Sequence, residues 1–317
     1  MIRAICLVFI LGMCQVPVWA QQCPGPLRIV VGLSAGGAMD AVARMLAQTY
    51  TQKFGQTMIV ENKVGATGNI AAQYVSKAQP DGCTLIIRGN EHNVNPLIFP
   101  SAGYEAKNFD PVARVVSGPA LLLVNASLPF NTVAELVAYA KANPGKLSYG
   151  TSGNGSANHV AMELFLKAAR IQMVHVPYKG SSAALVDLVS GSVPVAVGSV
   201  SAALPFINSG KLRALAVTGP TRWPSLPNVP TMNEAGHPAA GMVYWMGILA
   251  PAGTPLAVRK KFNQSFRVIL GEASIRERLH VDGWNAISES VDDFGRFLQH
   301  DERISRKLMN DLQVKIE

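Results

Sequence analysis

The 317-residue chain has few cysteines, few charged residues and none of the common motifs of catalytic sites. It contains four cysteines, and 15% of its residues are charged against 49% that are apolar. This balance is typical of a folded globular protein and excludes a largely disordered chain. The motifs Gly-x-Ser-x-Gly, His-Glu-x-x-His and Cys-x-x-Cys and a Walker-type loop are all missing. The six histidines are scattered with no carboxylate pair beside them, so we predict neither a metal nor a cofactor.

The positive charge is spread over the whole chain. The formal net charge is +8, but basic and aromatic residues do not cluster together and no zinc-finger spacing occurs. Nucleic acid is therefore not an expected partner. A basic exported protein steers anionic solutes towards itself, although the same charge is also compatible with an ordinary basic surface.

Residues 1–20 predict a secretory signal peptide. Arg3 supplies the positive start, Ala4–Met13 the apolar segment, and Val18-Trp19-Ala20 a small-x-small cleavage site. The apolar segment is too short for a convincing membrane span. We expect export with cleavage after Ala20.

Removal of this segment leaves two cysteines, Cys23 and Cys83. Each lies just before a predicted strand, Leu27–Leu33 and Thr84–Ile87. If these strands are neighbours, an oxidising compartment allows a disulfide between the cysteines. If they are not, both remain free thiols.

The stretch from Leu27 to Leu46 predicts a strand, a turn of small residues and a helix. The strand is an apolar run rich in β-branched residues, and Asp40 falls in the first helical turn, where a negative charge suits the helix dipole. The turn between them consists of Ser34, Ala35, Gly36 and Gly37. Such a turn leaves backbone N–H groups without partners and can bind an anion. The glycines could equally serve only to pack the strand closely against the helix.

Four further strand–loop–helix units follow, with loops at 62–67, 151–156, 177–181 and 198–199. Five such units predict an α/β protein with mainly parallel sheets, in which ligands bind outside the carboxyl ends of the strands. The C-terminal part has no complete unit of its own, so we expect it to return to the first group. The prediction is two lobes, each a mainly parallel sheet flanked by helices, joined by two crossovers. Lobe 1 takes residues 24–125 and 238–317, and lobe 2 takes residues 126–237.

Two patterns carry a chemical alternative. Ser156 and His159 near a helix start, together with Asp40, could form the triad of an exported hydrolase, but Ser156 is better explained as a helix cap. His92 lies in a predicted polar loop, where it could donate to a ligand or be solvated.

Several short motifs follow one another along the chain in a fixed order. They are Ser34-Ala35-Gly36-Gly37-x-x-Asp40, Val60-Glu61-Asn62, Gly65-x-x-Gly68-Asn69-Ile70, Pro80-Asp81-Gly82, Asn95-Pro96, Asn143-Pro144-Gly145-Lys146-Leu147, Ser152-Gly153-Asn154-Gly155, His175-Val176-Pro177-Tyr178-Lys179-Gly180, Leu212-Arg213-Ala214-Leu215-Ala216-Val217-Thr218 and Leu249-Ala250-Pro251-Ala252-Gly253-Thr254-Pro255. With these motifs the chain resembles the Bug family of periplasmic solute-binding proteins, which serve tripartite tricarboxylate transporters.

The resemblance implies a monomeric, non-enzymatic Venus-flytrap protein of the periplasm that closes on a small carboxylate. The first loop, Ser34, Ala35, Gly36, Gly37 and Asp40, is expected to hold one carboxylate. The loop of the opposite lobe, Ser152, Gly153, Asn154 and Ser156, is expected to clamp the other end, with Tyr178, Lys179 and Gly180 beside it. From their predicted loops alone, His92 and Ser199 are further candidates for the site. The implied partner is an inner-membrane permease or, alternatively, a membrane sensor kinase.

The chain departs from the family pattern at two places. Val197-Gly198-Ser199 stands where members usually carry a phenylalanine followed by an acidic residue, and Gly32-Leu33 replaces a proline–phenylalanine pair. The missing carboxylate removes a partner for a ligand ammonium group. We therefore expect a dicarboxylate without an amine, aliphatic or aromatic.

Overall fold

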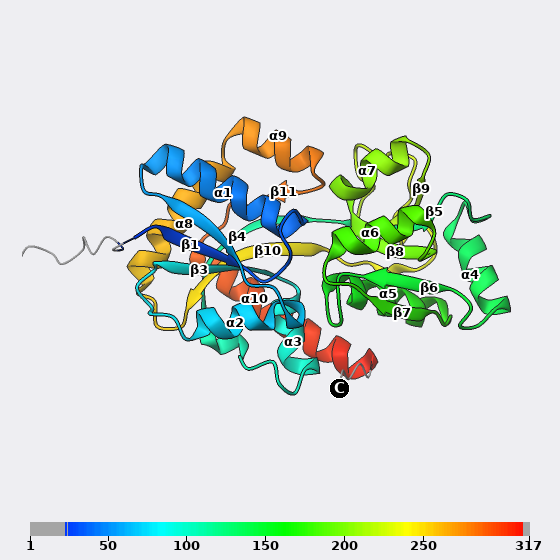
Figure 1. The fold of residues 1–317 in the computed structure, drawn as a ribbon, viewed down its shortest axis with the longest axis horizontal. Coiled ribbons are helices and arrows are strands. Elements are labelled where there is room, and N and C mark those ends of the chain that lie inside the picture. The colour runs from blue at the N-terminus through cyan, green and yellow to red at the C-terminus, as the bar shows by residue number, and fades with distance from the viewer. Residues whose placement is uncertain (1–22, 24, 313–317) are drawn as a thin grey trace, which may run out of the picture.

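The protein consists of two α/β lobes side by side, joined by extended chain segments (Figure 1). The computed structural model describes residue 23 and residues 25–312. The predicted signal peptide lies outside these residues. Within the described part of the chain, no helix is long and apolar enough to cross a membrane.

Lobe 1 is built on a six-stranded sheet of order β11-β4-β10-β3-β1-β2. Its strands are β1 (Leu27–Val31), β2 (Met58–Asn62), β3 (Thr84–Gly89), β4 (Phe109–Gly118), β10 (Tyr244–Pro251) and β11 (Asn285–Ala286). Its helices are α1 (Ala38–Phe54), α2 (Asn69–Ser76), α3 (Glu91–Ile98), α8 (Leu256–Leu270), α9 (Ala273–Val281) and α10 (Val291–Leu312), with short 3₁₀ turns η1 (Ala66–Gly68) and η2 (Ala106–Asn108).

Alternate residues of β1 enter different cores, because successive side chains of a strand point to opposite faces. Ile29 and Val31 pack in the same core as residues of α1 and α8. Val30 packs with residues of α2 and with Phe294 of α10. Helices therefore cover both faces of the sheet, which explains why its strands read as continuous apolar runs.

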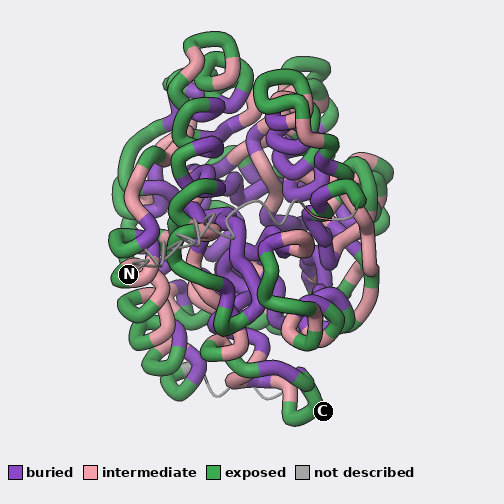
Figure 2. The backbone as a smooth tube through the Cα atoms, turned by 90° about the vertical axis from the view of Figure 1, so that its left-hand side faces the viewer, coloured by how far each residue is buried: buried purple, intermediate pink, exposed green. Residues whose placement is uncertain are grey.

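Lobe 2 is built on a five-stranded sheet of order β7-β6-β8-β5-β9. Its strands are β5 (Ala120–Asn125), β6 (Ser148–Thr151), β7 (Val174–Pro177), β8 (Val195–Ser199) and β9 (Leu212–Val217). Its helices are α4 (Val133–Ala142), α5 (Ala157–Ala169), α6 (Ser181–Ser190) and α7 (Val200–Asn208), followed by the 3₁₀ turn η3 (Pro238–Ala240). Buried residues run through the interior of the molecule, and exposed residues follow its outer helices and loops (Figure 2).

The two sheets are mixed, although most strands of each run in one direction. In lobe 1, β1, β2, β3 and β4 share a direction and β10 and β11 oppose it. In lobe 2, β5 alone opposes β6, β7, β8 and β9. The central reversed strands, β10 and β5, are those that follow a crossing from the other lobe. A chain that enters a sheet at the cleft edge runs against strands that end there.

The predicted boundary between the lobes is wrong at its first crossing. Residues 120–125 were assigned to lobe 1, but they form β5, which pairs with β8 and β9 of lobe 2. The chain therefore crosses at Pro119, directly between β4 and β5. The return crossing also comes a few residues after the expected 238, since η3 still packs against α5. An apolar run shows that a strand exists but not which sheet contains it.

A disulfide joins Cys23 to Cys83, with their Cα atoms 5.6 Å apart. β1 and β3 are adjacent parallel strands, in a register that pairs Arg28 with Thr84. The two segments before these strands therefore meet at the sheet edge opposite the cleft. Of the two alternatives left open for these cysteines, the structure contains the disulfide.

Candidate ligand-binding cleft

A cavity of about 310 Å³ lies between the lobes at the carboxyl ends of their strands. Five helices begin at its wall, namely α1 and α3 of lobe 1 and α5, α6 and α7 of lobe 2. Its volume falls in the usual range for a small-molecule site. Of the fourteen residues predicted for the site, eight line the cavity: Ser34, Gly37, Asp40, Ser152, Ser156, Lys179, Gly180 and Ser199. Ala35, Gly36, His92, Gly153, Asn154 and Tyr178 do not line it.

Helix N-termini dominate the polar part of the wall. The N-cap residues of α1, α6 and α7 are Gly37, Gly180 and Ser199, and none of them accepts a side-chain capping hydrogen bond. The first N–H groups of these helices are therefore not satisfied by their own caps. Together with the positive ends of the helix dipoles, they form a site suited to an anion. Lys179, an exposed residue, also lines the wall.

Asp40 holds the first loop in shape. Its carboxylate accepts hydrogen bonds from the Gly36 N–H at 2.9 Å, from Arg44 at 2.8 and 3.0 Å, and from the Asn62 amide at 2.9 Å. Burial alone raises the pKa of Asp40, but these hydrogen bonds outweigh it and keep the pKa below its ordinary value. Both carboxylate oxygens are used, so Asp40 supports the loop and the backbone of the loop is left for the ligand.

The loops of the two lobes also bind each other. The Ser34 hydroxyl donates to the Lys179 carbonyl at 2.7 Å, and the Thr67 hydroxyl donates to the Asn154 carbonyl at 2.8 Å. The Tyr244 hydroxyl of lobe 1 donates to the Ala157 carbonyl at 3.2 Å. The lobes are therefore closed over the cavity, and Asn154 serves this closure rather than the cavity wall.

Thr67 lies at the cavity because the backbone segments at Gly32 and Gly68 pack closely against each other next to it. A Cβ atom on Gly32 would lie 2.6 Å from the Cα atom of Gly68, so only glycine allows η1 to pack against the end of β1. The Gly32-Leu33 departure from the family pattern thus has a packing consequence at the cleft.

Tyr178 and His92 are placed away from the cavity wall. The Tyr178 hydroxyl donates to Asp187 at 2.6 Å within lobe 2. His92 was expected in a polar loop, but β3 runs into α3 with only Asn90 between them. The residue is 2% exposed, and its ring packs against Tyr104 and Phe109. Burial, with the nearby charge of Arg88, lowers the pKa of His92 to about 3, so this histidine is a neutral core residue.

The groups of the alternative triad are not assembled. Ser156 is the N-cap of α5, and its hydroxyl accepts the His159 backbone N–H at 3.3 Å. The His159 ring accepts the Gly155 N–H at 3.1 Å instead of contacting the Ser156 hydroxyl. Asp40 is tied to Arg44 in the other lobe. No group of three or more metal-ligating side chains occurs among the described residues either.

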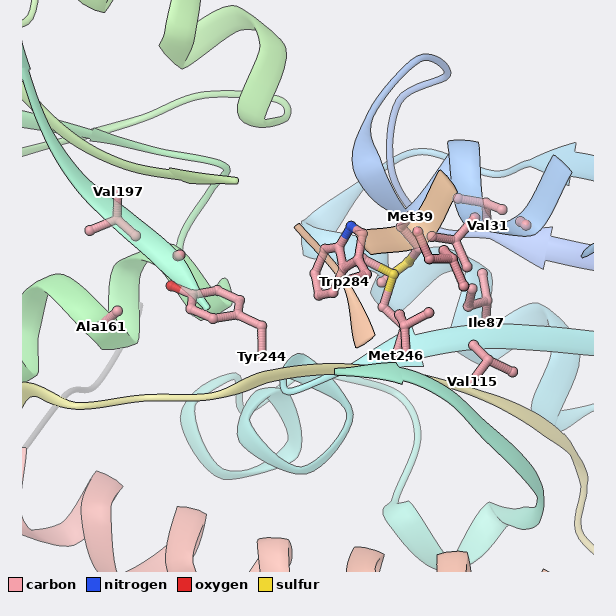
Figure 3. Packing of buried hydrophobic residues seen from close by; sticks show 14 of the residues in the cluster. Val31, Met39, Ile87, Val115, Ala161, Val197, Tyr244, Met246 and Trp284 are labelled. Atoms are coloured by element: carbon pink, nitrogen blue, oxygen red, sulfur yellow. The ribbon is translucent and has the colours of Figure 1, made fainter. Parts of the chain in front are cut away.

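Several cavity residues were missed by the sequence reasoning. They are Met39, Thr67, Asn90, Glu91, Asn158, Ser181, Tyr244, Trp245, Met246 and Trp284. Met39, Met246 and Trp284 gather on the side of lobe 1, and Tyr244 projects from the same strand as Met246 towards lobe 2 (Figure 3). The apolar run 241–250 indicated a strand, but only its insertion between β3 and β4 brings its first residues to the cleft.

The fold and the cavity define a two-lobed solute-binding protein with its site between the lobes. The chain belongs to the tripartite tricarboxylate transporter receptor family (TctC), whose profile matches residues 42–314. This finding confirms the resemblance to the Bug-type proteins.

Three solved structures show how far the likeness extends. Rpa4515 of R. palustris, solved with adipate, has a TM-score of 0.88 and 34% identity over 92% of this chain and 98% of its own. The periplasmic binding protein BugD has a TM-score of 0.87 and 31% identity over 93% of this chain and 99% of its own. MatC of Rhodopseudomonas palustris, solved with malate, has a TM-score of 0.85 and 29% identity over 90% of this chain and 99% of its own.

Proposed function

We propose that this protein captures a small carboxylate between its lobes in the periplasm and delivers it to a permease of the tripartite tricarboxylate type. The observation that carries the proposal is the convergence of helix N-termini from both lobes on one closed cavity. Adipate and malate in the structures of Rpa4515 and MatC support the ligand class. The predicted signal peptide and the disulfide support an oxidising compartment outside the cytoplasm.

Within this class we propose a dicarboxylate without an amine. The support is that Val197-Gly198-Ser199, at the end of β8, provides no acidic side chain for an ammonium group. Titration calorimetry with succinate and aspartate, which differ in the amine, tests this preference. Tighter binding of aspartate would contradict it.

A charge placed in the cavity tests the site itself. Ser152 lines the cavity and is largely buried, so Ser152→Asp should repel a carboxylate and weaken its binding at least about tenfold, the equivalent of 1.4 kcal/mol. Ser192, an exposed residue of the same lobe outside the cavity, gives the matched control Ser192→Asp, which should bind as the unmodified protein does. Failure of the unmodified protein to bind any carboxylate would overturn the proposed function.

The partner and the absence of catalysis are tested separately. Genes for a large and a small membrane subunit beside this gene would favour the permease, whereas a neighbouring two-component pair would favour a sensor kinase. Ester turnover that disappears in Ser156→Ala would instead support the hydrolase alternative. Light scattering of the purified protein tests the monomer.

A further inference from the structure

Glu91 is an acidic side chain in the wall of the cleft. Its second oxygen has no hydrogen-bond partner in the part of the chain that the structure describes. It is the first residue of α3, is 7% exposed, and lines the cavity beside Gly89 and Asn90. Its Oε1 atom accepts the Gly89 N–H at 2.9 Å and lies 3.6 Å from Nε of Arg88. Among the described residues, no group donates a hydrogen bond to Oε2.

The unpartnered oxygen lies at the cavity surface. A Cβ atom on Gly89 would lie 3.0 Å from Oε2 of Glu91 and 3.7 Å from the terminal methyl of Met39. Gly89 and Met39 both line the cavity, so this oxygen borders the apolar part of the wall. The oxygen is open to the cavity rather than fully buried. A ligand that fills the cavity removes it from water, and unless that ligand supplies a donor the oxygen is then left unpaired at a cost in free energy.

The charge around Glu91 favours a neutral donor. Arg88 is 1% exposed and lies against the same carboxylate. It also donates to the Gly68 carbonyl at 3.0 Å, the Tyr104 hydroxyl at 2.7 Å and the Glu91 backbone carbonyl at 3.4 Å, all uncharged. The Arg88–Glu91 pair is thus already neutral. A ligand ammonium here would leave an excess buried positive charge, and a ligand carboxylate would face a like charge.

We propose that Glu91 is a specificity-determining residue that accepts a hydrogen bond from a hydroxyl group of the ligand. The inference rests on the proposed function and narrows it to hydroxycarboxylates. The carboxylate binds at the helix N-termini, and the hydroxyl faces Oε2 of Glu91. Sites built to hydrogen-bond a hydroxyl discriminate strongly against analogues that lack it, because the buried group is then left unpaired.

Matched ligand pairs test the proposal on the unmodified protein. Malate and succinate differ only in a hydroxyl, as do 5-hydroxyisophthalate and isophthalate. Calorimetry should give at least about tenfold tighter binding for the hydroxylated member of at least one pair. Aspartate, with an ammonium in place of the malate hydroxyl, should bind more weakly than malate.

Glu91→Gln tests whether this residue causes the preference. The amide keeps the shape and an acceptor for the Gly89 N–H, but it replaces the charged acceptor Oε2 by a neutral donor. The ligand hydroxyl can then only accept, in a weaker hydrogen bond between neutral groups. The hydroxyl preference should shrink to within about threefold. Glu289→Gln is the control, since Glu289 is a half-buried carboxylate paired with Arg114 outside the cavity, and it should leave the preference unchanged.

The outcomes separate this inference from the proposed function. Equal binding within both pairs, or binding of adipate but of neither hydroxylated acid, overturns the role of Glu91 and leaves carboxylate capture standing. Tighter binding of aspartate than of malate would contradict the inference that the ligand group facing Glu91 is an uncharged donor. An unchanged preference in a folded Glu91→Gln protein assigns it to another residue. If that variant does not fold, Glu91→Asp, which keeps the charge but shortens the side chain by one methylene, takes its place in the same comparison.

Discussion

The side chain of Asp40 connects the first loop of lobe 1 to α1 and β2 through four hydrogen bonds. Because its pKa is lowered on folding, the ionised carboxylate stabilises the folded state. That contribution is present above the unfolded pKa of about 3.9 and is lost as pH falls through the lower, folded value. At neutral pH it is fully present.

Asp40→Asn should therefore destabilise the protein at pH 7 and loosen the loop. The amide cannot accept at both positions, and a hydrogen bond to a charged group contributes about 1.5–3 kcal/mol. Since Arg44 is half exposed, we expect a loss near the lower end, measured by urea unfolding, together with weaker carboxylate binding. Glu277→Gln, at an exposed position in the middle of α9, should change neither. A variant of unchanged stability would show that the loop keeps its shape without Asp40.

Two histidines hydrogen-bond to the end of β6 and to the segment between β6 and α5. The rings of His159 and His175 are stacked with centroids 4.1 Å apart. His159 accepts the Gly155 N–H, and Nε2 of His175 lies 2.7 Å from the Thr151 hydroxyl. On the far side of His175, Tyr149 stacks at 5.0 Å. Glu163 lies 3.8 Å from His159 but accepts the Tyr149 hydroxyl at 2.5 Å.

Acid should weaken this element. Burial lowers the pKa of His159 to about 4, and burial with the neighbouring His159 lowers that of His175 to about 4. A histidine with a folded pKa below its unfolded value contributes stability that is present above about pH 6.5 and is lost as pH falls towards 4. Protonation of His159 would also turn the acceptor for Gly155 into a donor.

His159→Gln removes one titrating group from the pair. Between pH 7 and pH 4.5 the variant should lose about 2 kcal/mol less stability than the unmodified protein. His92, also buried, contributes to the acid sensitivity of both proteins and cancels in the comparison. His300→Gln, at an exposed position of α10, should follow the unmodified protein. If the free energy of unfolding depended on pH in the same way for all three proteins, the histidine pair would not contribute to the acid sensitivity.

At the level of elements, the sequence patterns predict where strands and helices lie along the chain. They do not predict which sheet a strand joins or in which direction it runs there. The run 27–33 followed by small residues correctly indicated β1, its turn and α1, because burial and turn chemistry are local. The runs of β5 and β10 look no different from the others, yet they enter the sheets against most of the strands. Asn90 and Glu91 read as polar loop residues, although they begin a helix at the cleft. Their role depends on which elements pack around them.

Closure of the whole molecule also involves an apolar contact outside the cavity. Val160 of α5 in lobe 2 is 3% exposed and packs in one cluster with Val94 and Ile98 of α3 and Met309 of α10 in lobe 1. Helix α10 runs beneath lobe 1 and ends below lobe 2 (Figure 1). Near that end, Lys167 of α5 donates to the Asp311 carbonyl at 2.5 Å. Opening the cleft would return this apolar surface to water.

Val160→Ala should therefore weaken ligand binding without touching the ligand. Removing two methyl groups from an interface formed on closure forfeits about 1–1.5 kcal/mol of the closed state, which corresponds to roughly five- to tenfold weaker binding. The open state already exposes this side chain, so unfolding of the unliganded protein should change less. Val137→Ala, in the core of lobe 2 away from the interface, should do the opposite and lower stability while leaving affinity intact. Equal affinity for Val160→Ala and the unmodified protein would mean that this cluster contributes nothing to closure, and the cavity loops would then have to hold the lobes together alone.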